Sequence, residues 1–186
     1  MNNDLEYLRR AIIVSRNARD NGNHPFGAIL VNANGNIVLE AENTVTTEND
    51  VTNHAETNLV RLASRSIPHN ELPSHTLYTS CEPCAMCAGA IYWAGIGRVV
   101  YGLAETGLLA ITGSHPENPT LSHPCRLVFA DGGRPTEVSG PAHRRRSRET
   151  TCRLLELEER GTISLRAVQG WPWPSNEAPV WGRNRP

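Results

Sequence analysis

Three potential metal ligands and one carboxylate stand at spacings that suit a catalytic zinc site. Glu56 follows His54 by two residues, and Cys84 and Cys87 are three residues apart. Two thiolates and an imidazole suit a tetrahedral zinc ion, and three protein ligands leave the fourth position open for water. A carboxylate two residues from the histidine can move protons to and from that water without binding the metal. The pattern therefore predicts hydrolytic chemistry at one zinc ion per chain.

Other interpretations of these residues stay open at this point. Cys84 and Cys87 can be buried core cysteines, and Glu56 can be an acid favoured by the helix dipole in a first turn. Cys81 precedes Cys84 by three residues, and a third thiolate would close the site into a structural Cys₃His centre. Such a chain would be a zinc-stabilised binding module without catalysis. We expect Cys81 to point elsewhere, because it ends a strand just before the turn at Pro83.

Alternating helices and strands must position these residues. Apolar residues at helical spacing predict a first helix over 4–21, and an Asn-Gly turn between two apolar runs predicts a hairpin of 27–31 and 37–41. The polar stretch 42–53 is expected to be a loop. Further expected elements are a helix over 54–64, a strand over 75–80, a helix over 83–94 and a strand over 98–102. This order favours an α/β fold, with a sheet covered by helices and at least one parallel strand pair.

The pattern weakens beyond residue 106. Expected elements there are a loop over 112–126, short strands over 126–131 and 135–139, and a helix over 143–160. A tail with three Trp and four Pro follows residue 169 and has no periodicity. We therefore expect one catalytic domain over 1–160 and a C-terminal extension over 161–186.

Composition and charge narrow the location and the partners. The 186 residues carry a formal net charge of −1, and residues 1–142 hold nine Arg against 14 acidic residues. This balance argues against nucleic acid as the main partner, because phosphates need a basic surface. The chain shows neither a secretory signal pattern nor an apolar run of the ~20 residues that a membrane span needs. Five cysteines, two of them at metal spacing, fit a reducing cytosol, so we expect a cytoplasmic protein.

The motif His54-Ala55-Glu56 with Pro83-Cys84-x-x-Cys87 resembles the cytidine and deoxycytidylate deaminase superfamily. The stretches that carry the resemblance are Pro25–Ala28, Asn43–Glu56 and Leu77–Ala94, and together they look closest to the branch of guanine deaminases and transfer-RNA adenosine deaminases. The resemblance implies a three-layer α/β/α fold, with a mixed five-stranded sheet and helices on both faces. It also implies a homo-oligomer, often a homodimer, that releases ammonia from a nitrogen heterocycle.

By the same resemblance His54, Cys84 and Cys87 are the zinc ligands and Glu56 is the catalytic proton shuttle. Asn43 matches an asparagine that hydrogen-bonds the substrate ring or ribose. Further candidate substrate contacts are Phe26, Ala55 and Trp93. Pro25-Phe26-Gly27 resembles guanine deaminases, and an aromatic ring would stack on a flat base, although Phe26 can equally be a core residue.

The expected function is thus deamination of a small purine base or nucleoside in purine metabolism, and the alternative is a transfer-RNA adenosine deaminase. Two departures from the family leave the substrate open. Asn53 stands where the family commonly has alanine, and the C-terminal third does not match the expected closing helix.

Overall fold

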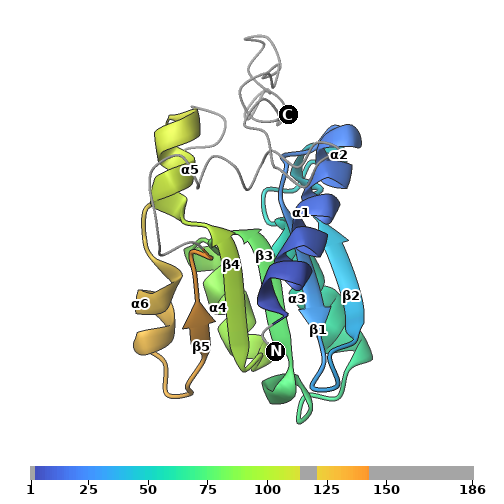
Figure 1. Ribbon diagram of the computed structural model, residues 1–186, viewed down its shortest axis with the longest axis vertical. Helices are drawn as coiled ribbons and strands as arrows, with labels where there is room; N and C mark the ends of the chain where they lie inside the picture. Colours follow the sequence, from blue (N-terminus) through green and yellow to red (C-terminus); the bar gives the residue numbers. More distant parts are fainter. Residues whose placement is uncertain (1–2, 114–120, 143–186) are drawn as a thin grey trace, which may run out of the picture.

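A mixed five-stranded sheet in the order β2-β1-β3-β4-β5 forms the centre of the molecule (Figure 1). The strands are β1 (Gly27–Val31), β2 (Ile37–Glu42), β3 (Thr76–Cys81), β4 (Arg98–Leu103) and β5 (Glu137–Ser139). β1 pairs antiparallel with β2 and with β3, whereas β3, β4 and β5 are parallel. The computed structural model describes residues 3–113 and 121–142. The expected helix over 143–160 and the domain boundary after residue 160 lie outside these residues.

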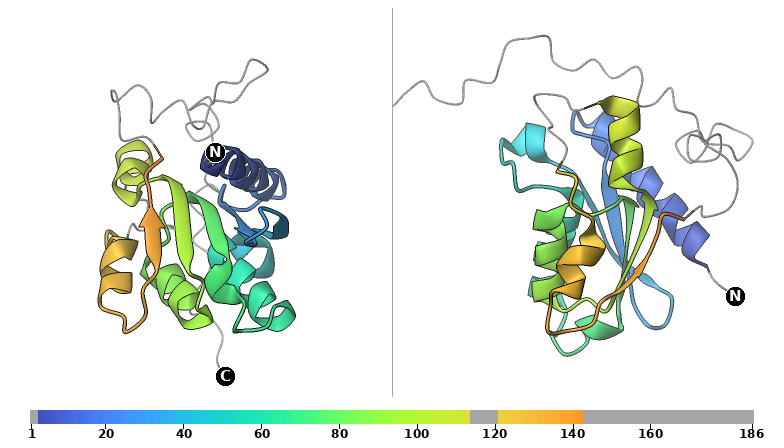
Figure 2. Two further views of the ribbon diagram at one scale, coloured as in Figure 1. Left: turned by 60° about the horizontal axis from the view of Figure 1, so that its bottom comes forward. Right: turned by 90° about the vertical axis from the view of Figure 1, so that its left-hand side faces the viewer.

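Helices cover both faces of the sheet, which confirms the three-layer arrangement (Figure 2). One face carries α1 (Asp4–Asp20), and the other carries α3 (Ala55–Ser66), α4 (Ala85–Ala94) and α6 (Cys125–Ala130). Three short helices complete the fold: α2 (Val45–Glu48), the 3₁₀ helix η1 (Leu72–Ser74), and α5 (Glu105–Thr112), which begins beyond the carboxyl end of β4. Within the described residues, no helix is both long enough and apolar enough to cross a membrane.

Two apolar layers hold these elements together. On one face, Leu8 and Val14 of α1 pack against Ile29 of β1, and all three are almost fully buried. On the other face, Leu59 and Ile91 belong to a larger core between the sheet, α3 and α4. Each large aliphatic side chain that leaves water contributes about 1.5–3 kcal/mol. The larger core therefore fixes the two helices whose N-terminal ends carry the metal-ligand motif.

The α1 layer approaches β1 so closely that only glycine fits at one position. A Cβ atom on Gly27 would overlap backbone atoms of Ser15 and Ala11 in α1. Gly27 also donates its backbone N–H to the hydroxyl of Ser80 in β3, at 3.2 Å. The neighbouring Phe26 is thereby held at a fixed place at the start of β1.

Most elements lie where the sequence pattern predicts them, but three helices do not. The stretch expected as a polar loop contains α2, whose Thr46 and Thr47 backbone N–H groups both donate to the Asn23 side-chain oxygen, at 3.1 and 3.0 Å. The apolar pattern after residue 106 is too weak to predict α5, which the structure shows. The expected strand over 126–131 is wrong, because Cys125–Ala130 forms α6. The short strand expected over 135–139 is confirmed as β5.

Candidate metal centre and active site

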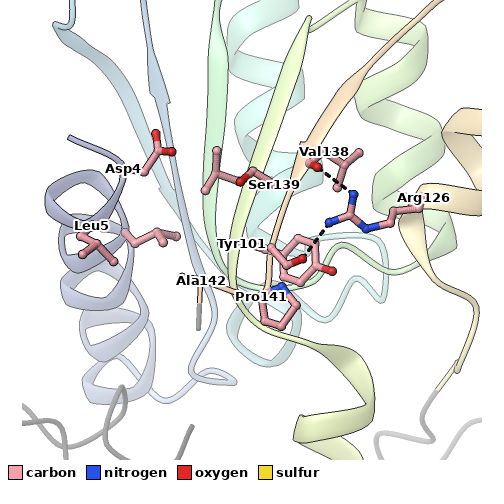
Figure 3. A pocket seen from close by; sticks show the side chains of 11 residues that line it. Asp4, Leu5, Tyr101, Arg126, Val138, Ser139, Pro141 and Ala142 are labelled. Atoms are coloured by element: carbon pink, nitrogen blue, oxygen red, sulfur yellow. Dashed lines mark hydrogen bonds between the residues drawn. The ribbon is translucent and has the colours of Figure 1, made fainter. Parts of the chain in front are cut away.

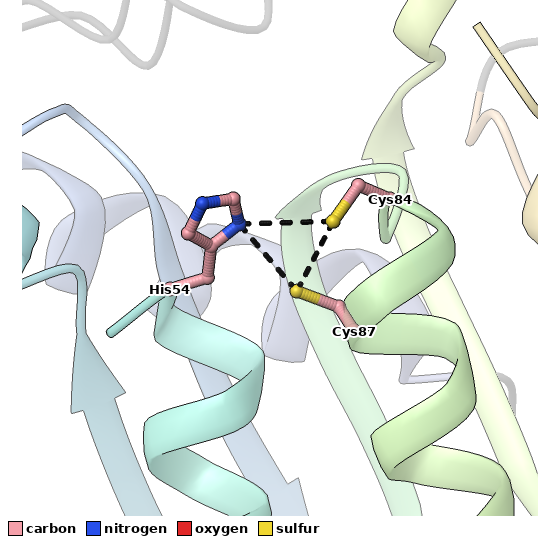
Figure 4. Close-up of side chains that lie close together, drawn as sticks. All are labelled: His54, Cys84 and Cys87. Atoms are coloured by element: carbon pink, nitrogen blue, oxygen red, sulfur yellow. Dashed lines mark hydrogen bonds between the residues drawn. The ribbon is translucent and has the colours of Figure 1, made fainter. Parts of the chain in front are cut away.

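His54, Cys84 and Cys87 form a triangle of ligand atoms at the start of α3 and α4 (Figure 4). The two sulfurs are 3.6 Å apart, and His54 Nδ1 lies 3.7 Å from Cys84 Sγ and 3.6 Å from Cys87 Sγ. Tetrahedral zinc, with bonds of about 2.3 Å to sulfur and about 2.0 Å to nitrogen, separates two sulfurs by about 3.8 Å and sulfur from nitrogen by about 3.5 Å. The donor set and the size of the triangle therefore fit zinc.

The two helix starts explain why these side chains meet. His54 is the N-cap residue of α3, with φ −66° and ψ 153°, and Cys84 is the N-cap residue of α4, with φ −64° and ψ 171°. In this extended conformation each residue stands just outside its helix. Pro83 consequently precedes α4, although the sequence pattern placed it in the first turn.

Electrostatics at the triangle favour thiolate. The hydrogen bond with Cys87, with a smaller contribution from His54, lowers the pKa of Cys84 to about 4. The pKa of Cys87 is raised, mainly by its hydrogen bond with Cys84. These opposite shifts favour a thiolate at Cys84 beside a thiol at Cys87. A divalent cation would bind both as thiolates, because metal ligands must be deprotonated.

Glu56 lies beside the triangle and is 5% exposed. Its Oε1 atom accepts a hydrogen bond of 2.7 Å from the Thr79 hydroxyl, and its Oε2 atom lies 3.5 Å from Cys87 Sγ. Burial raises the pKa of this carboxyl. The group can therefore hold a proton next to the metal position without being a ligand, and Thr79, which sequence reasoning missed, fixes its orientation.

A pocket of about 370 Å³ opens above these residues. His54, Glu56 and Cys84 contribute to its lining. Other parts of the wall come from side chains that include Phe26, Val45, Glu82, Met86, Glu105 and Leu108. The triangle and the Glu56 carboxylate are therefore accessible to a small molecule.

A larger cavity of about 780 Å³ lies between α1, β4 and β5 (Figure 3). Arg126 is the one basic residue in the described lining of this cavity. The Arg126 guanidinium donates hydrogen bonds to the carbonyl oxygens of Val138 and Gly140, both at 2.7 Å. Among the described residues, the only metal-ligating group is His54 with the two cysteines, and it does not line this cavity. The smaller pocket is therefore the candidate active site.

The predicted substrate contacts are distributed unevenly around that pocket. Phe26 lines it. Asn43 is fully buried; its Oδ1 accepts from the Val45 backbone N–H at 3.1 Å, and its Nδ2 has no partner among the described residues. Ala55 is buried at the first position of α3 and is not part of the pocket lining. Trp93 is 77% exposed on α4 and lies outside the pocket.

Cys81 does not join the metal triangle. Within the described residues the ligand group contains His54, Cys84 and Cys87 alone, so the closed Cys₃His site is not formed. Cys81 nevertheless faces the pocket, although we expected it to point elsewhere. Burial raises the pKa of its thiol, which keeps it neutral.

Glu82 and Glu105 are pocket residues that sequence reasoning missed. Glu82 directly follows β3, and Glu105 comes two residues after β4. Because these neighbouring strands are parallel, their carboxyl ends meet at one edge of the sheet, where open α/β sheets bind ligands. Two acids placed just after neighbouring strands are therefore a signal that could have found them.

Comparisons with known proteins agree with this geometry. Residues 1–103 match the family described as cytidine and deoxycytidylate deaminase zinc-binding region. The chain is 47% identical to a probable cytosine deaminase of Schizosaccharomyces pombe over 138 residues, which cover 74% of this chain and 83% of that protein.

Two further relatives have other substrates in their names. The crystal structure of guanine deaminase from Bacillus subtilis superposes with a TM-score of 0.55 and 33% identity, covering 81% of this chain and 89% of that one. A transfer-RNA-specific adenosine deaminase of Agrobacterium fabrum is 38% identical over 53% of this chain and 64% of its own length. The family match over more than half of the chain and the His-Cys-Cys triangle together show that this protein belongs to the zinc-binding cytidine and deoxycytidylate deaminase family.

Proposed function

We propose that this protein catalyses the zinc-dependent hydrolytic deamination of a small, uncharged nucleobase or nucleoside, with a guanine-like purine as the first candidate. The observation that carries the proposal is the metal-ligand triangle, which has the Glu56 carboxylate beside it and a pocket of about 370 Å³ above it. Ligand geometry, a proton-transfer group and room for a heterocycle thus coincide at one place.

The protein's own groups fit the proton transfers of this reaction. A bound zinc ion would lower the pKa of a water molecule to ~7 and act as a Lewis acid at the pocket floor. Glu56 can accept the proton that this water loses and pass it to a ring nitrogen of the substrate. As the C–N bond breaks, Glu56 can move a second proton from the newly added hydroxyl group to the amino group, which leaves as ammonia. The hydrogen bond from Thr79 keeps the carboxylate in one orientation through these transfers. Its raised pKa suits a group that must hold a proton between two steps.

The charge of the pocket supports an uncharged substrate. Glu56, Glu82 and Glu105 line it, and none of its lining residues in the described part of the chain is Arg. A phosphate group would therefore meet carboxylates and no guanidinium to balance its charge. This argues for bases and nucleosides over nucleotides and over the phosphate backbone of RNA.

Phe26 and Asn43 support a flat heterocycle that carries a carbonyl group. The Phe26 ring lines the pocket and offers a face on which a base can stack. The Asn43 backbone N–H donates to the Phe26 carbonyl at 3.0 Å, which places the two residues side by side. The Nδ2 of Asn43 lacks an acceptor among the described residues, but Asn43 is fully buried and does not line the pocket, so a substrate oxygen would satisfy this group only if the pocket wall next to Phe26 opened.

Cytosine is a second candidate substrate, since the probable cytosine deaminase of Schizosaccharomyces pombe is 47% identical over 83% of its length. Adenosine in transfer RNA is a third, because several relatives are transfer-RNA adenosine deaminases. We rank it below the free bases because of the acidic pocket.

We expect about one zinc per purified chain, together with ammonia release from guanine or cytosine. The measurement is metal analysis followed by an ammonia assay on guanine, guanosine, cytosine, cytidine, adenine and adenosine. Inosine formation in transfer RNA is measured in parallel, with the Glu56→Gln protein as the blank. Inosine in an anticodon loop without ammonia from any free base would reverse the ranking. A zinc-free protein that is inactive on every substrate would contradict the proposal.

We also propose that the chain forms a homodimer through the outer face of α4. The helix contains no charged residue, and its side chains Met86 and Trp93 are 37% and 77% exposed. Exposed apolar side chains gathered on one helix mark interaction sites more often than isolated ones do. Met86 also lines the pocket, so this interface would adjoin the active site.

Trp93→Arg is expected to convert a dimer into a monomer, because the charge cannot be buried unpaired between two apolar faces. Light scattering after size exclusion gives the molar mass. Leu5→Arg is the matched control, since Leu5 is 48% exposed on α1, across the sheet from α4. A Trp93→Arg protein with the mass of the unaltered dimer would exclude this interface.

A further inference from the structure

The three carboxylates of the pocket differ in what they bind within the protein. Both oxygens of Glu82 accept backbone N–H groups, from Glu105 and from Cys125, each at 3.2 Å. Glu56 accepts from Thr79 on one oxygen and faces Cys87 with the other. The carboxylate of Glu105 accepts no hydrogen bond from any described residue and forms no ion pair with one. It is thus the one pocket carboxylate whose oxygens are open to a ligand.

The position of Glu105 is fixed although its carboxylate is free. Glu105 begins α5, and its backbone N–H is held by Glu82, which is buried. The same Glu82 side chain holds the first residue of α6, so α5 and α6 are tied to the end of β3. The open acceptor of Glu105 is therefore presented from an anchored helix start.

The surroundings of Glu105 are partly buried and negatively charged. Burial, followed by the nearby Cys84, Glu82 and Glu56, raises the pKa of Glu105 to about 7. A half-buried acceptor without a partner loses part of its hydration without a compensating bond. A ligand that donates an N–H group would restore that bond, and an anionic ligand would be repelled.

We propose that Glu105 is a specificity residue that accepts a hydrogen bond from a ring N–H or exocyclic amino group of the substrate. This inference rests on the proposed deaminase function. It narrows the substrate class to amino heterocycles with an N–H donor on the edge that faces α5. Zinc binding and proton transfer do not involve Glu105, so its loss weakens substrate binding and leaves the metal in place.

The test measures substrate binding without turnover. Zinc-loaded Glu56→Gln protein is titrated with guanine and with cytosine by equilibrium dialysis, alone and combined with Glu105→Met or Glu105→Gln. Met keeps the length of the side chain but removes the acceptor, and Gln restores a neutral acceptor. Glu6→Gln removes an exposed carboxylate on α1 and serves as the control for net charge.

At pH 8.5, above the pKa of about 7 for Glu105, Glu105→Met is expected to raise the dissociation constant of the bound base by about tenfold to a hundredfold, the range for a hydrogen bond to a charged group. Glu105→Gln should recover part of the loss, and both should keep one zinc per chain. A dissociation constant that stays within twofold in Glu105→Met, or that changes equally in Glu6→Gln, would overturn the inference alone. Failure of the parent protein to bind either base overturns the proposed substrate class together with this inference.

Discussion

Glu56→Gln is expected to lower kcat by about 10²–10⁴-fold while zinc content and melting temperature stay unchanged. The amide keeps the size of the side chain and can still accept from the Thr79 hydroxyl, whose oxygen lies 2.7 Å from Oε1. It cannot take up and return a proton, and in this site the same group serves several transfers in succession. The loss should therefore reach the upper end of the range.

The measurement combines single-turnover ammonia release with metal analysis on the same preparation. Thr79→Val is the companion variant, because it removes the orienting hydroxyl and leaves the carboxylate. It should reduce kcat less than Glu56→Gln does. Near-normal turnover of the Glu56→Gln protein would remove Glu56 from the proton-shuttle role.

Cys84→Ala and Cys87→Ala are each expected to abolish stable zinc binding and to lower the free energy of unfolding. Each substitution removes one corner of a triangle whose sides are 3.6–3.7 Å. Zinc that binds only the folded state stabilises it by about 1.4 kcal/mol for each factor of ten by which its concentration exceeds the dissociation constant. That contribution disappears with the metal.

Thermal unfolding with and without a chelator separates the metal from the side chain. A chelator should lower the melting temperature of the unaltered protein and of Cys81→Ala, because Cys81 lies outside the triangle. It should have no effect on Cys84→Ala or Cys87→Ala, which have no zinc to lose. Full zinc occupancy in either variant would show that the triangle is not the metal site.

The cysteine pair of the candidate metal centre could be predicted from the sequence because its spacing is local, whereas His54 is 30 residues from Cys84 and only the fold brings it there. Cys84 and Cys87 are one helical turn apart, so any helix that starts there brings them together. The hairpin was predictable for the same reason, since the turn between β1 and β2 carries Gly35 at φ 79°.

The missed helices depend on contacts between distant residues. The apolar run Leu127–Phe129 is compatible with a strand. A helix starts there because the Cys125 backbone N–H donates a hydrogen bond to the Glu82 carboxylate, 43 residues away in the sequence. α2 depends in the same way on Asn23, which caps Thr46 and Thr47. Periodicity in a short window carries no information about such long-range caps.

The substrate contacts were only partly predictable for a related reason. Phe26 lies in the pocket as expected, whereas Trp93 projects from the outer face of α4. Glu105 reaches the pocket only because parallel pairing aligns the ends of β3 and β4. A fold had to be known before that juxtaposition could be seen.

The family match ends at residue 103, and α5 begins at Glu105. The candidate metal ligands, spaced over residues 54–87, therefore lie within the part that matches the family, whereas Glu105 and Leu108 of the pocket wall lie just beyond it. Glu82 ties α5 and α6 to the end of β3 by accepting hydrogen bonds from backbone N–H groups. These bonds do not depend on which side chains α5 carries. Side chains on α5 can therefore change without disturbing the backbone contacts that tie this helix to the end of β3.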